Sequence, residues 1–217
     1  MADQGTAIRA RRLQATEGDI PESVASDGTR GRILEAALHL FAETSYAGAS
    51  IREIATAAGV QSASLYAHFP SKERILAELA VIGHEEHHRR LRHALLESGP
   101  DPAAQLTALV RAHVRMHCEL SMLAVVCNNE LHSLSPALAE PVMATRDSST
   151  QLFNEVIQRG VDLGEFAPAH VWLAVAAIGG MGVRVANWYT PGFELTIDQV
   201  ADTYADFALG IVRSKVR

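Results

Sequence analysis

The amino-acid sequence predicts an all-α protein with an N-terminal three-helix, helix-turn-helix domain and a larger C-terminal helical domain. Three observations predict this class. Apolar residues recur at helical spacing in successive segments, and glycine or proline stands where these segments end. Hydrophobic residues make up 48% of the 217 residues, which is enough for two modest cores. We expect a tail at residues 1–28, a first domain at residues 29–74 and a second at residues 75–217.

Composition limits the class of protein further. Cys118 and Cys127 are the only cysteines and lack the spacing of a disulfide framework, so free thiols are expected. The first residues contain no apolar signal segment. The longest uncharged apolar run, Val171–Val183, is shorter than the ~18 residues that a membrane helix needs. We therefore expect a cytoplasmic protein without a membrane partner.

The N-terminal residues 1–28 lack apolar periodicity and mix basic, acidic and small residues, which is typical of a disordered tail. The basic residues that bear on function are Arg9, Arg11 and Arg12. Two interpretations stay open: an arm that reaches the DNA minor groove, or a solvated tail, which is favoured. The first helix is expected from Thr29 to about Thr44, with an apolar face that covers the two helices after it.

A helix-turn-helix is expected between residues 50 and 70. Ser50 and Glu53 have capping-box spacing, which starts a short helix. Gly59 follows the last apolar residue of that helix, where a left-handed backbone ends it at little cost. Ser62 is expected to cap a second short helix, which must stop before Pro70. Two short helices joined by a tight glycine-containing turn are typical of DNA-binding proteins.

Helical geometry predicts which side of the second helix is exposed. At roughly 100° per residue, Leu65 and Phe69 share one stripe and should be buried. The residues opposite or beside this stripe are Ala63, Ser64, Ala67, Tyr66 and His68. Such residues on a recognition helix meet base edges or phosphates in the major groove. The alternative is an ordinary amphipathic hairpin of an all-α protein.

Charge is unevenly distributed along the chain. The net charge is −6, whereas DNA-binding domains usually carry a basic surface. Residues 28–74 contain five Lys and Arg residues and four Glu residues, a net charge of +1. The acidity therefore belongs to the C-terminal part, and tight DNA binding should require two subunits and depend on salt.

The next segment, Ser71–Ser98, is expected to form one long helix that ends at Gly99. Within it, His84, Glu85 and His88 match the H-E-x-x-H pattern of zinc hydrolases. That pattern would need a third ligand, and the neighbouring residues are rich in charge. A solvated helix face is therefore the favoured interpretation, and we expect no catalytic residue, metal or cofactor.

Polar residues interrupt the apolar helices of the C-terminal part. His113 and His117 lie four apart on the helix expected at Pro102–Glu119. They would share a face as core histidines, ligand contacts or metal ligands. Asn128 follows an apolar run, before a second long helix from about Pro136 to Asp162. A few polar groups on apolar helices are what a ligand cavity shows, although the same residues could cap helix ends.

Two final helices are expected at Pro168–Trp188 and Thr196–Val212. The apolar residues of both follow alternating spacings of three and four, and the first contains several glycines and alanines. Small residues let another helix approach closely. A homodimer through these two helices is expected, with core packing inside one subunit as the alternative.

The run from Thr29 to Lys72, which includes LFAETSYAGASIREIATAAGVQSASLYAHFPSKERIL, resembles the N-terminal domain of the TetR/AcrR transcriptional regulators. The resemblance implies a two-domain, all-helical homodimer whose C-terminal domain binds a small molecule and thereby controls operator binding. The DNA contacts that it implies are Ser50, Arg52, Gln61, Ser62, Ala63, Ser64, Tyr66, His68 and Lys72. Ala63 stands where many relatives carry Gly or Pro.

The C-terminal run WYTPGFELTIDQVADTYADFALGIV is similar to TetR-type repressors that sense acyl-CoA thioesters. Thr190 stands where those relatives often have a basic residue. The candidate ligand-binding residues are His113, His117, Asn128, Arg184 and Trp188. The last two lie four apart on one helical face.

The expected function is a ligand-responsive DNA-binding transcriptional regulator and repressor. Its partners would be a palindromic double-stranded DNA operator and a small hydrophobic effector, with an acyl-CoA-like metabolite as one candidate. The alternatives are a multidrug-type ligand sensor of the same fold, a zinc-dependent hydrolase that uses His84, Glu85 and His88, and a helical adaptor that binds no DNA.

Overall fold

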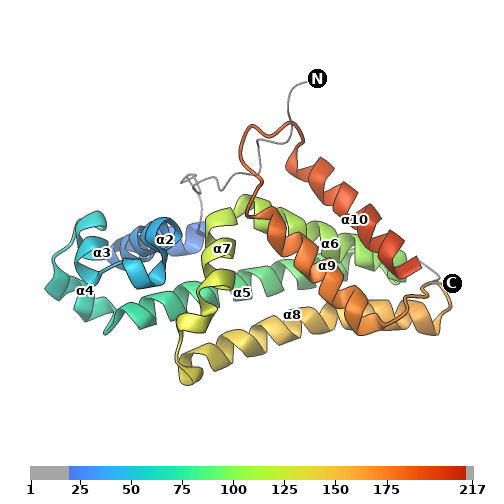
Figure 1. The fold of residues 1–217 in the computed structure, drawn as a ribbon, viewed down its shortest axis with the longest axis horizontal. Coiled ribbons are helices and arrows are strands. Elements are labelled where there is room, and N and C mark those ends of the chain that lie inside the picture. The colour runs from blue at the N-terminus through green and yellow to red at the C-terminus, as the bar shows by residue number, and fades with distance from the viewer. Residues whose placement is uncertain (1–19, 214–217) are drawn as a thin grey trace.

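The computed structural model describes residues 20–213, and every regular element in this range is a helix (Figure 1). The helices are α1 (Glu22–Ala25), α2 (Gly28–Gly48), α3 (Ile51–Ala57), α4 (Ser62–His68), α5 (Lys72–Glu97), α6 (Pro102–Glu119), α7 (Ser121–Asn129), the 3-10 turn η2 (Leu131–Ser133), α8 (Pro136–Asp162), α9 (Val171–Val185) and α10 (Ile197–Arg213). None of the described helices has the length and apolar character that a membrane crossing requires. The all-α prediction is confirmed.

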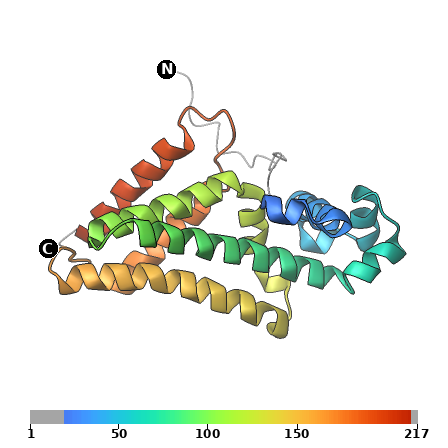
Figure 2. The ribbon, with the colours of Figure 1, turned by 180° about the vertical axis from the view of Figure 1, so that it is seen from behind.

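The molecule is elongated, with α2, α3 and α4 at one end and the longer helices at the other (Figure 1). The helix α5 runs from the small end into the larger part, where α5, α6 and α8 lie side by side (Figure 2). The helix α10 packs against α6, and α9 contacts both α6 and α8. A change in the position of α5 at one end is therefore carried to the other by a single rigid element.

The helix-turn-helix forms for the local reasons that the sequence indicates. The Ser50 hydroxyl accepts a hydrogen bond from the Glu53 amide at 3.2 Å, and the Glu53 carboxylate accepts from the Ser50 amide at 2.8 Å. This capping box satisfies two donors that the helix itself leaves free. Gly59 has a φ of 66° in the turn, a conformation that favours glycine.

The start of α4 differs from the prediction by one residue. Gln61 is the N-cap, with an extended backbone and no side-chain cap, and Ser62 already lies in the first turn. The buried stripe is confirmed, because Leu65 and Phe69 are fully buried. Phe69 has the extended backbone that a residue before proline adopts.

The segment just before α2 is not a tail. Ile20 is buried in the hydrophobic core, and residues Glu22–Ala25 form α1, which packs on α2. Burying an isoleucine gains about 1.5–3 kcal/mol, which outweighs the weak helical preference of this short segment. The predicted tail is thus wrong for residues 20–28. Residues 1–19, with the three arginines of the suggested minor-groove arm, lie outside the described residues.

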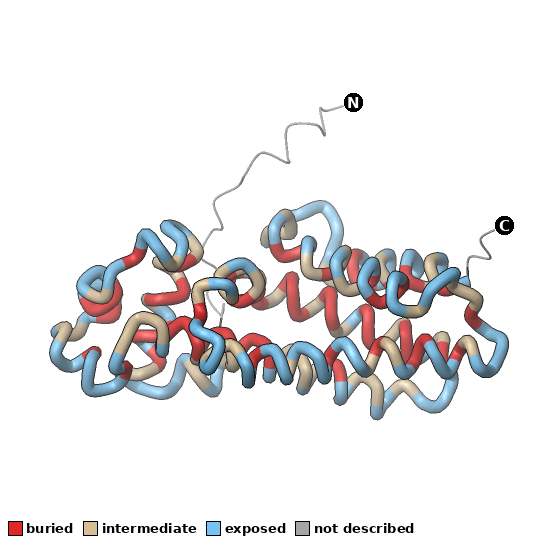
Figure 3. Tube along the Cα trace, turned by 60° about the horizontal axis from the view of Figure 1, so that its bottom comes forward, coloured by how far each residue is buried: buried red, intermediate tan, exposed pale blue. Residues whose placement is uncertain are grey.

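Buried residues form two hydrophobic clusters along the interior (Figure 3). The first joins α2, α3, α4 and the start of α5 with α7, including Leu38, Leu76 and Leu123. The second joins α6, α8, α9 and α10. The helix-turn-helix therefore shares its core with α7, which belongs to the C-terminal part of the chain.

A candidate nucleic-acid interface and an adjoining cavity

The helix α4 presents a small, uncharged outer surface at the end of the molecule. Ala63, Ser64 and Ala67 are exposed, and the Tyr66 side chain beside them is 52% exposed. The helix contains no acidic residue. Short side chains let a helix approach base edges closely, and Ser and Ala can contact bases directly. The helix α4 therefore has no acidic side chain that would repel DNA phosphates.

Arg30 holds the far end of α4 in place. Its guanidinium lies 4.4 Å from the centre of the Phe69 ring and donates to the His68 carbonyl at 3.3 Å. The same group forms an ion pair with Glu78 on α5. Arg30 therefore orients α4 against α2 and α5 and is engaged inside the domain.

Lys72 has a structural role that its position in the sequence does not reveal. Its ammonium donates to the Tyr46 carbonyl at 2.6 Å and to the Ala49 carbonyl at 2.7 Å. It also lies 4.2 Å from the centre of the Tyr46 ring. Two of its three donors thus bind the turn that precedes α3, which leaves at most one for a phosphate.

Replacing Lys72 by Met should therefore destabilise the helix-turn-helix itself. Loss of two charge-assisted hydrogen bonds and a cation–π contact should lower the free energy of unfolding by about 2–4 kcal/mol. Urea denaturation followed by circular dichroism measures this change. Arg74→Met, an exposed position in the first turn of the same helix, should change it by less than about 0.5 kcal/mol. Equal stability of the two variants would contradict the structural role of Lys72.

The remaining predicted DNA contacts lie at the same end of the molecule. Ser50 and Arg52 are exposed at the start of α3, and Gln61 and His68 are exposed at the two ends of α4. Ser62 is half-buried in the first turn of α4. The nine predicted residues thus come from α3, α4 and the start of α5, which meet at one end (Figure 1).

A cavity of about 610 Å³ lies between α5, α6, α7, α8 and α9, within the usual range for small-molecule sites. Four of the five predicted ligand residues line it: His113, His117, Asn128 and Arg184. Trp188 does not line it, because its ring packs against Phe193, with 5.3 Å between ring centres. Helical spacing placed Trp188 beside Arg184, but α9 ends at Val185 and the chain turns away.

Sequence reasoning missed several residues of this cavity. They are His84 and His87 on α5, and Arg146, Ser149, Thr150 and Phe153 on α8. Among the described lining residues, the guanidinium groups of Arg146 and Arg184 are the formal charges, and no carboxylate is present. The formal charges among the described lining residues are therefore all positive.

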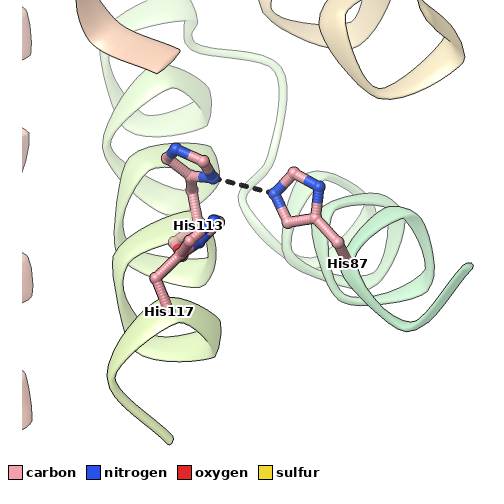
Figure 4. Close-up of side chains that lie close together, drawn as sticks. All are labelled: His87, His113 and His117. Carbon is pink, nitrogen blue, oxygen red and sulfur yellow. Dashed lines mark hydrogen bonds between the residues drawn. The ribbon is translucent and has the colours of Figure 1, made fainter. Parts of the chain in front are cut away.

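Three histidines meet on one side of the cavity (Figure 4). His87 Nε2 lies 2.8 Å from His113 Nδ1, and each of the three rings offers a nitrogen within 4.8 Å of those of the other two. His113 Nε2 lies 3.1 Å from the Gly179 carbonyl, and His117 Nδ1 lies 2.8 Å from the His113 carbonyl. A carbonyl can only accept, so both of these ring nitrogens donate.

Burial keeps these imidazoles neutral. Desolvation lowers the pKa of His113 to about 4 and that of His117 to about 3. It also lowers the pKa of His87 well below its usual value, and that of His84 to about 4. The apolar surroundings disfavour the charged form of each ring.

The protein should therefore lose stability in mild acid. An unfolded histidine has a pKa of about 6.5. Below that pH the unfolded chain therefore binds protons that the buried histidines of the folded chain do not bind. The free energy of unfolding should fall between about pH 6.5 and pH 4, by up to about 3 kcal/mol for a ring such as His113. Urea midpoints measured with a chelator at pH 7.5 and pH 5 test this. An unchanged midpoint would contradict the burial of neutral histidines.

The H-E-x-x-H pattern does not form the zinc site of the alternative hydrolase interpretation. His84 is buried in the cavity wall, Glu85 is exposed, and His88 Nδ1 lies 3.1 Å from the Ser149 hydroxyl. The favoured interpretation of a solvated helix face is thus wrong for His84. Among the described residues, the His, Cys, Asp and Glu side chains grouped closely enough to hold a metal ion are His87, His113 and His117. The side chains of the suggested hydrolase do not converge.

Comparisons with known proteins agree with this arrangement. The model of the "Bacterial regulatory proteins, tetR family" matches residues 33–79, and that of the "Tetracyclin repressor-like, C-terminal domain" matches residues 99–212. The chain is 30% identical to the HTH-type transcriptional repressor KstR2 of Rhodococcus jostii over 184 residues, which cover 84% of this chain and 90% of that protein.

Two solved structures show the same architecture. A bacterial regulatory protein in the tetR family from Rhodococcus RHA1 has a TM-score of 0.81 and 28% identity, covering 86% of this chain and 98% of that one. AibR, in a complex with isovaleryl coenzyme A and operator DNA, has a TM-score of 0.72 and 22% identity, covering 83% and 96%, and shows the fold alone.

An all-helical subunit with an exposed helix-turn-helix at one end and a cavity in its helical bundle is a DNA-binding transcriptional regulator of the ligand-responsive class. The chain belongs to the TetR family.

Proposed function

We propose that the protein is a homodimeric, cytoplasmic and non-enzymatic repressor that leaves a near-palindromic operator when a small molecule fills the cavity. The observation that carries this proposal is the double role of α7. Cys127 and Asn128 of α7 line the cavity, while Leu123 and Val126 belong to the core of the helix-turn-helix. A ligand that displaces α7 would therefore change the packing under α2 and α5.

A second contact supports the same coupling. The Glu73 carboxylate, in the first turn of α5, accepts a hydrogen bond from the Ser135 amide at 2.7 Å, directly before α8. The start of α8 is thus tied to the residues that follow α4. A ligand can shift the protein between two such arrangements only by its different affinity for them. Because α7 and α8 contact both the cavity and the helix-turn-helix end, we expect the ligand's affinity to differ between the two arrangements.

The proposed effector has a hydrophobic body and an anionic group, as an acyl-CoA thioester has. Arg146 and Arg184 face a cavity whose described lining contains no carboxylate. The structure of AibR with isovaleryl coenzyme A shows that a protein of this fold accommodates such a molecule. The cavity volume suits the acyl portion, and Arg184, which lines the cavity and is exposed, would be available to a larger polar portion.

The proposed dimer uses the outer sides of α9 and α10. Trp172 and Leu173 on α9 and Phe207 on α10 are more than half exposed, an unusual state for such large apolar side chains. Ile178 is fully buried inside the subunit, with Val175 and Val185 on the same face. The regular apolar stripe of α9 is therefore subunit core, and the outer face would form the interface.

Operator selection from genomic fragments, followed by gel-shift titration, tests the proposed function. We expect a near-palindromic site that is released by medium-chain or sterol-derived acyl-CoA thioesters and not by free coenzyme A. Arg184→Gln should bind the operator normally but require about tenfold more effector for release, because a charge-assisted contact is lost. Arg92→Gln, exposed on α5 outside the cavity, should behave like the wild type. Failure to select any operator would overturn the proposal.

A further inference from the structure

We infer that the cavity contains a transition-metal site in which His87, His113 and His117 bind one Zn²⁺ ion and leave a fourth position open towards the cavity. Three imidazole nitrogens are a donor set that suits zinc and related divalent ions. Three protein ligands with one open position are typical of zinc sites that bind a further molecule. This inference does not depend on operator binding.

The geometry requires small side-chain movements and, at His87, a proton on Nδ1 in place of Nε2, because His87 Nε2 donates to the unprotonated His113 Nδ1 before an ion binds. Zinc–nitrogen distances of about 2.0–2.1 Å place neighbouring ligand atoms of a tetrahedral site about 3.3 Å apart. His87 Nε2 and His113 Nδ1 are 2.8 Å apart, and the three ligand atoms all lie within 4.8 Å of one another. Shifts of at most about 1.5 Å, within the reach of ring rotations, would close the site around an ion.

The hydrogen bonds to backbone carbonyls orient two of the rings as zinc ligands are oriented. His113 Nε2 donates to Gly179 and His117 Nδ1 donates to His113, so His113 Nδ1 and His117 Nε2 carry the lone pairs. Metal-bound histidines almost always donate their other nitrogen in this way, which fixes the tautomer.

The backbone of α9 lies close to the His113 ring at Gly182. A side chain at Gly182 would overlap the imidazole of His113, because a Cβ there has no room beside that ring. Glycine at this position therefore lets α9 lie close enough for Gly179 to accept from His113. The site joins α5 to α6, with α9 orienting one ligand.

A fourth histidine of the cavity, His84, indicates that the cavity takes up a further polar group. His84 Nε2 is buried in the same cavity and has no hydrogen-bond partner among the described residues. Buried polar atoms are nearly always paired, so an unpaired one points to a molecule that belongs there. Water or an effector atom in the open fourth position of the metal would lie in the same cavity, which His84 lines.

Metal binding is measured on the untagged full-length protein without DNA, so that failure of the operator experiments leaves the result unaffected. Zn²⁺ competition against a chromophoric chelator should give one ion per subunit, and Co²⁺ should give the visible ligand-field bands of a four- or five-coordinate site. His87→Ala and His117→Ala should each weaken Zn²⁺ binding by more than about 100-fold, beyond the 10–100-fold loss typical when a residue that only hydrogen-bonds to a metal ligand is changed.

The chain has ten histidines, and the controls separate the three proposed ligands from the other seven. His93→Ala removes an exposed histidine of the same helix, which pairs with Glu97, and should leave zinc affinity unchanged. Gly182→Ala alters no ligand but displaces the His113 ring and should weaken binding. No stoichiometric uptake by the wild type, or full uptake by both ligand variants, would overturn the inference.

A crystal soaked in zinc gives an answer that does not depend on the folding of any variant. Anomalous scattering at the zinc edge should show one peak between the rings of His87, His113 and His117. A peak only elsewhere, or none, would refute the site.

Discussion

Replacing Ser64 by Glu should abolish specific operator binding while the protein stays folded and dimeric. The Ser64 side chain is exposed at the centre of the outer face of α4. A carboxylate there would face phosphates and base acceptors in both half-sites. Loss of a base contact worth about 1–3 kcal/mol in each half-site, with added repulsion, predicts a loss of affinity of more than about 100-fold.

The control for Ser64→Glu must add the same negative charge far from α4. Ser148→Glu on α8 provides it, because Ser148 is also exposed on a helix and far along the chain from the helix-turn-helix. Glutamate suits an exposed helical position at least as well as serine, so both variants should have wild-type thermal unfolding. If Ser64→Glu binds the operator within about threefold of Ser148→Glu, the outer face of α4 does not enter the groove.

Replacing Phe207 by Arg should convert the dimer into monomers. The Phe207 side chain is 55% exposed on α10 and packs only against Tyr204 among the described aromatic rings. A two-fold symmetric interface would contain Phe207 twice, once from each subunit. Losing about 1.5–3 kcal/mol of burial on each side and bringing two cations together should weaken dimerisation by at least about 1,000-fold.

Sedimentation velocity at micromolar concentration measures the effect on the dimer. Leu96→Arg makes the same kind of change at an exposed leucine on α5, outside α9 and α10, and should leave the dimer intact. Operator affinity should fall together with dimerisation, because one subunit contacts only a half-site. A persistent Phe207→Arg dimer would assign the interface to another surface.

Local patterns were sufficient for most of the fold. The capping box of Ser50 and Glu53, the glycine after α5 and the proline at the start of α6 all form as predicted. The bounds of α6 and α8 agree with the prediction, because Asp101 caps the first and a proline begins each of them. These signals act over a few residues, so they can be read from the chain alone.

Predictions about which face meets which neighbour were less successful. The dimer was expected through the last two helices, with core packing as the alternative, and Ile178 of α9 is subunit core. Ile20 was assigned to a tail, but it fills a place beside α2. Trp188 was assigned to the cavity, but it packs on Phe193 outside it. Helical spacing gave a face for Ile178 and Trp188, but which neighbour each residue meets depends on how the helices pack and on where α9 ends.

By itself, the sequence determined most of the helices, the two-part architecture and the residues on the outer face of α4, because periodicity and capping are local properties. Only the tertiary structure decided the role of Lys72, which binds carbonyls 23 and 26 residues away. It also brought His87 on α5 beside His113 on α6, which are 26 residues apart. The physical reason is that such contacts depend on how helices pack, and packing is set by all the buried surfaces of the molecule together.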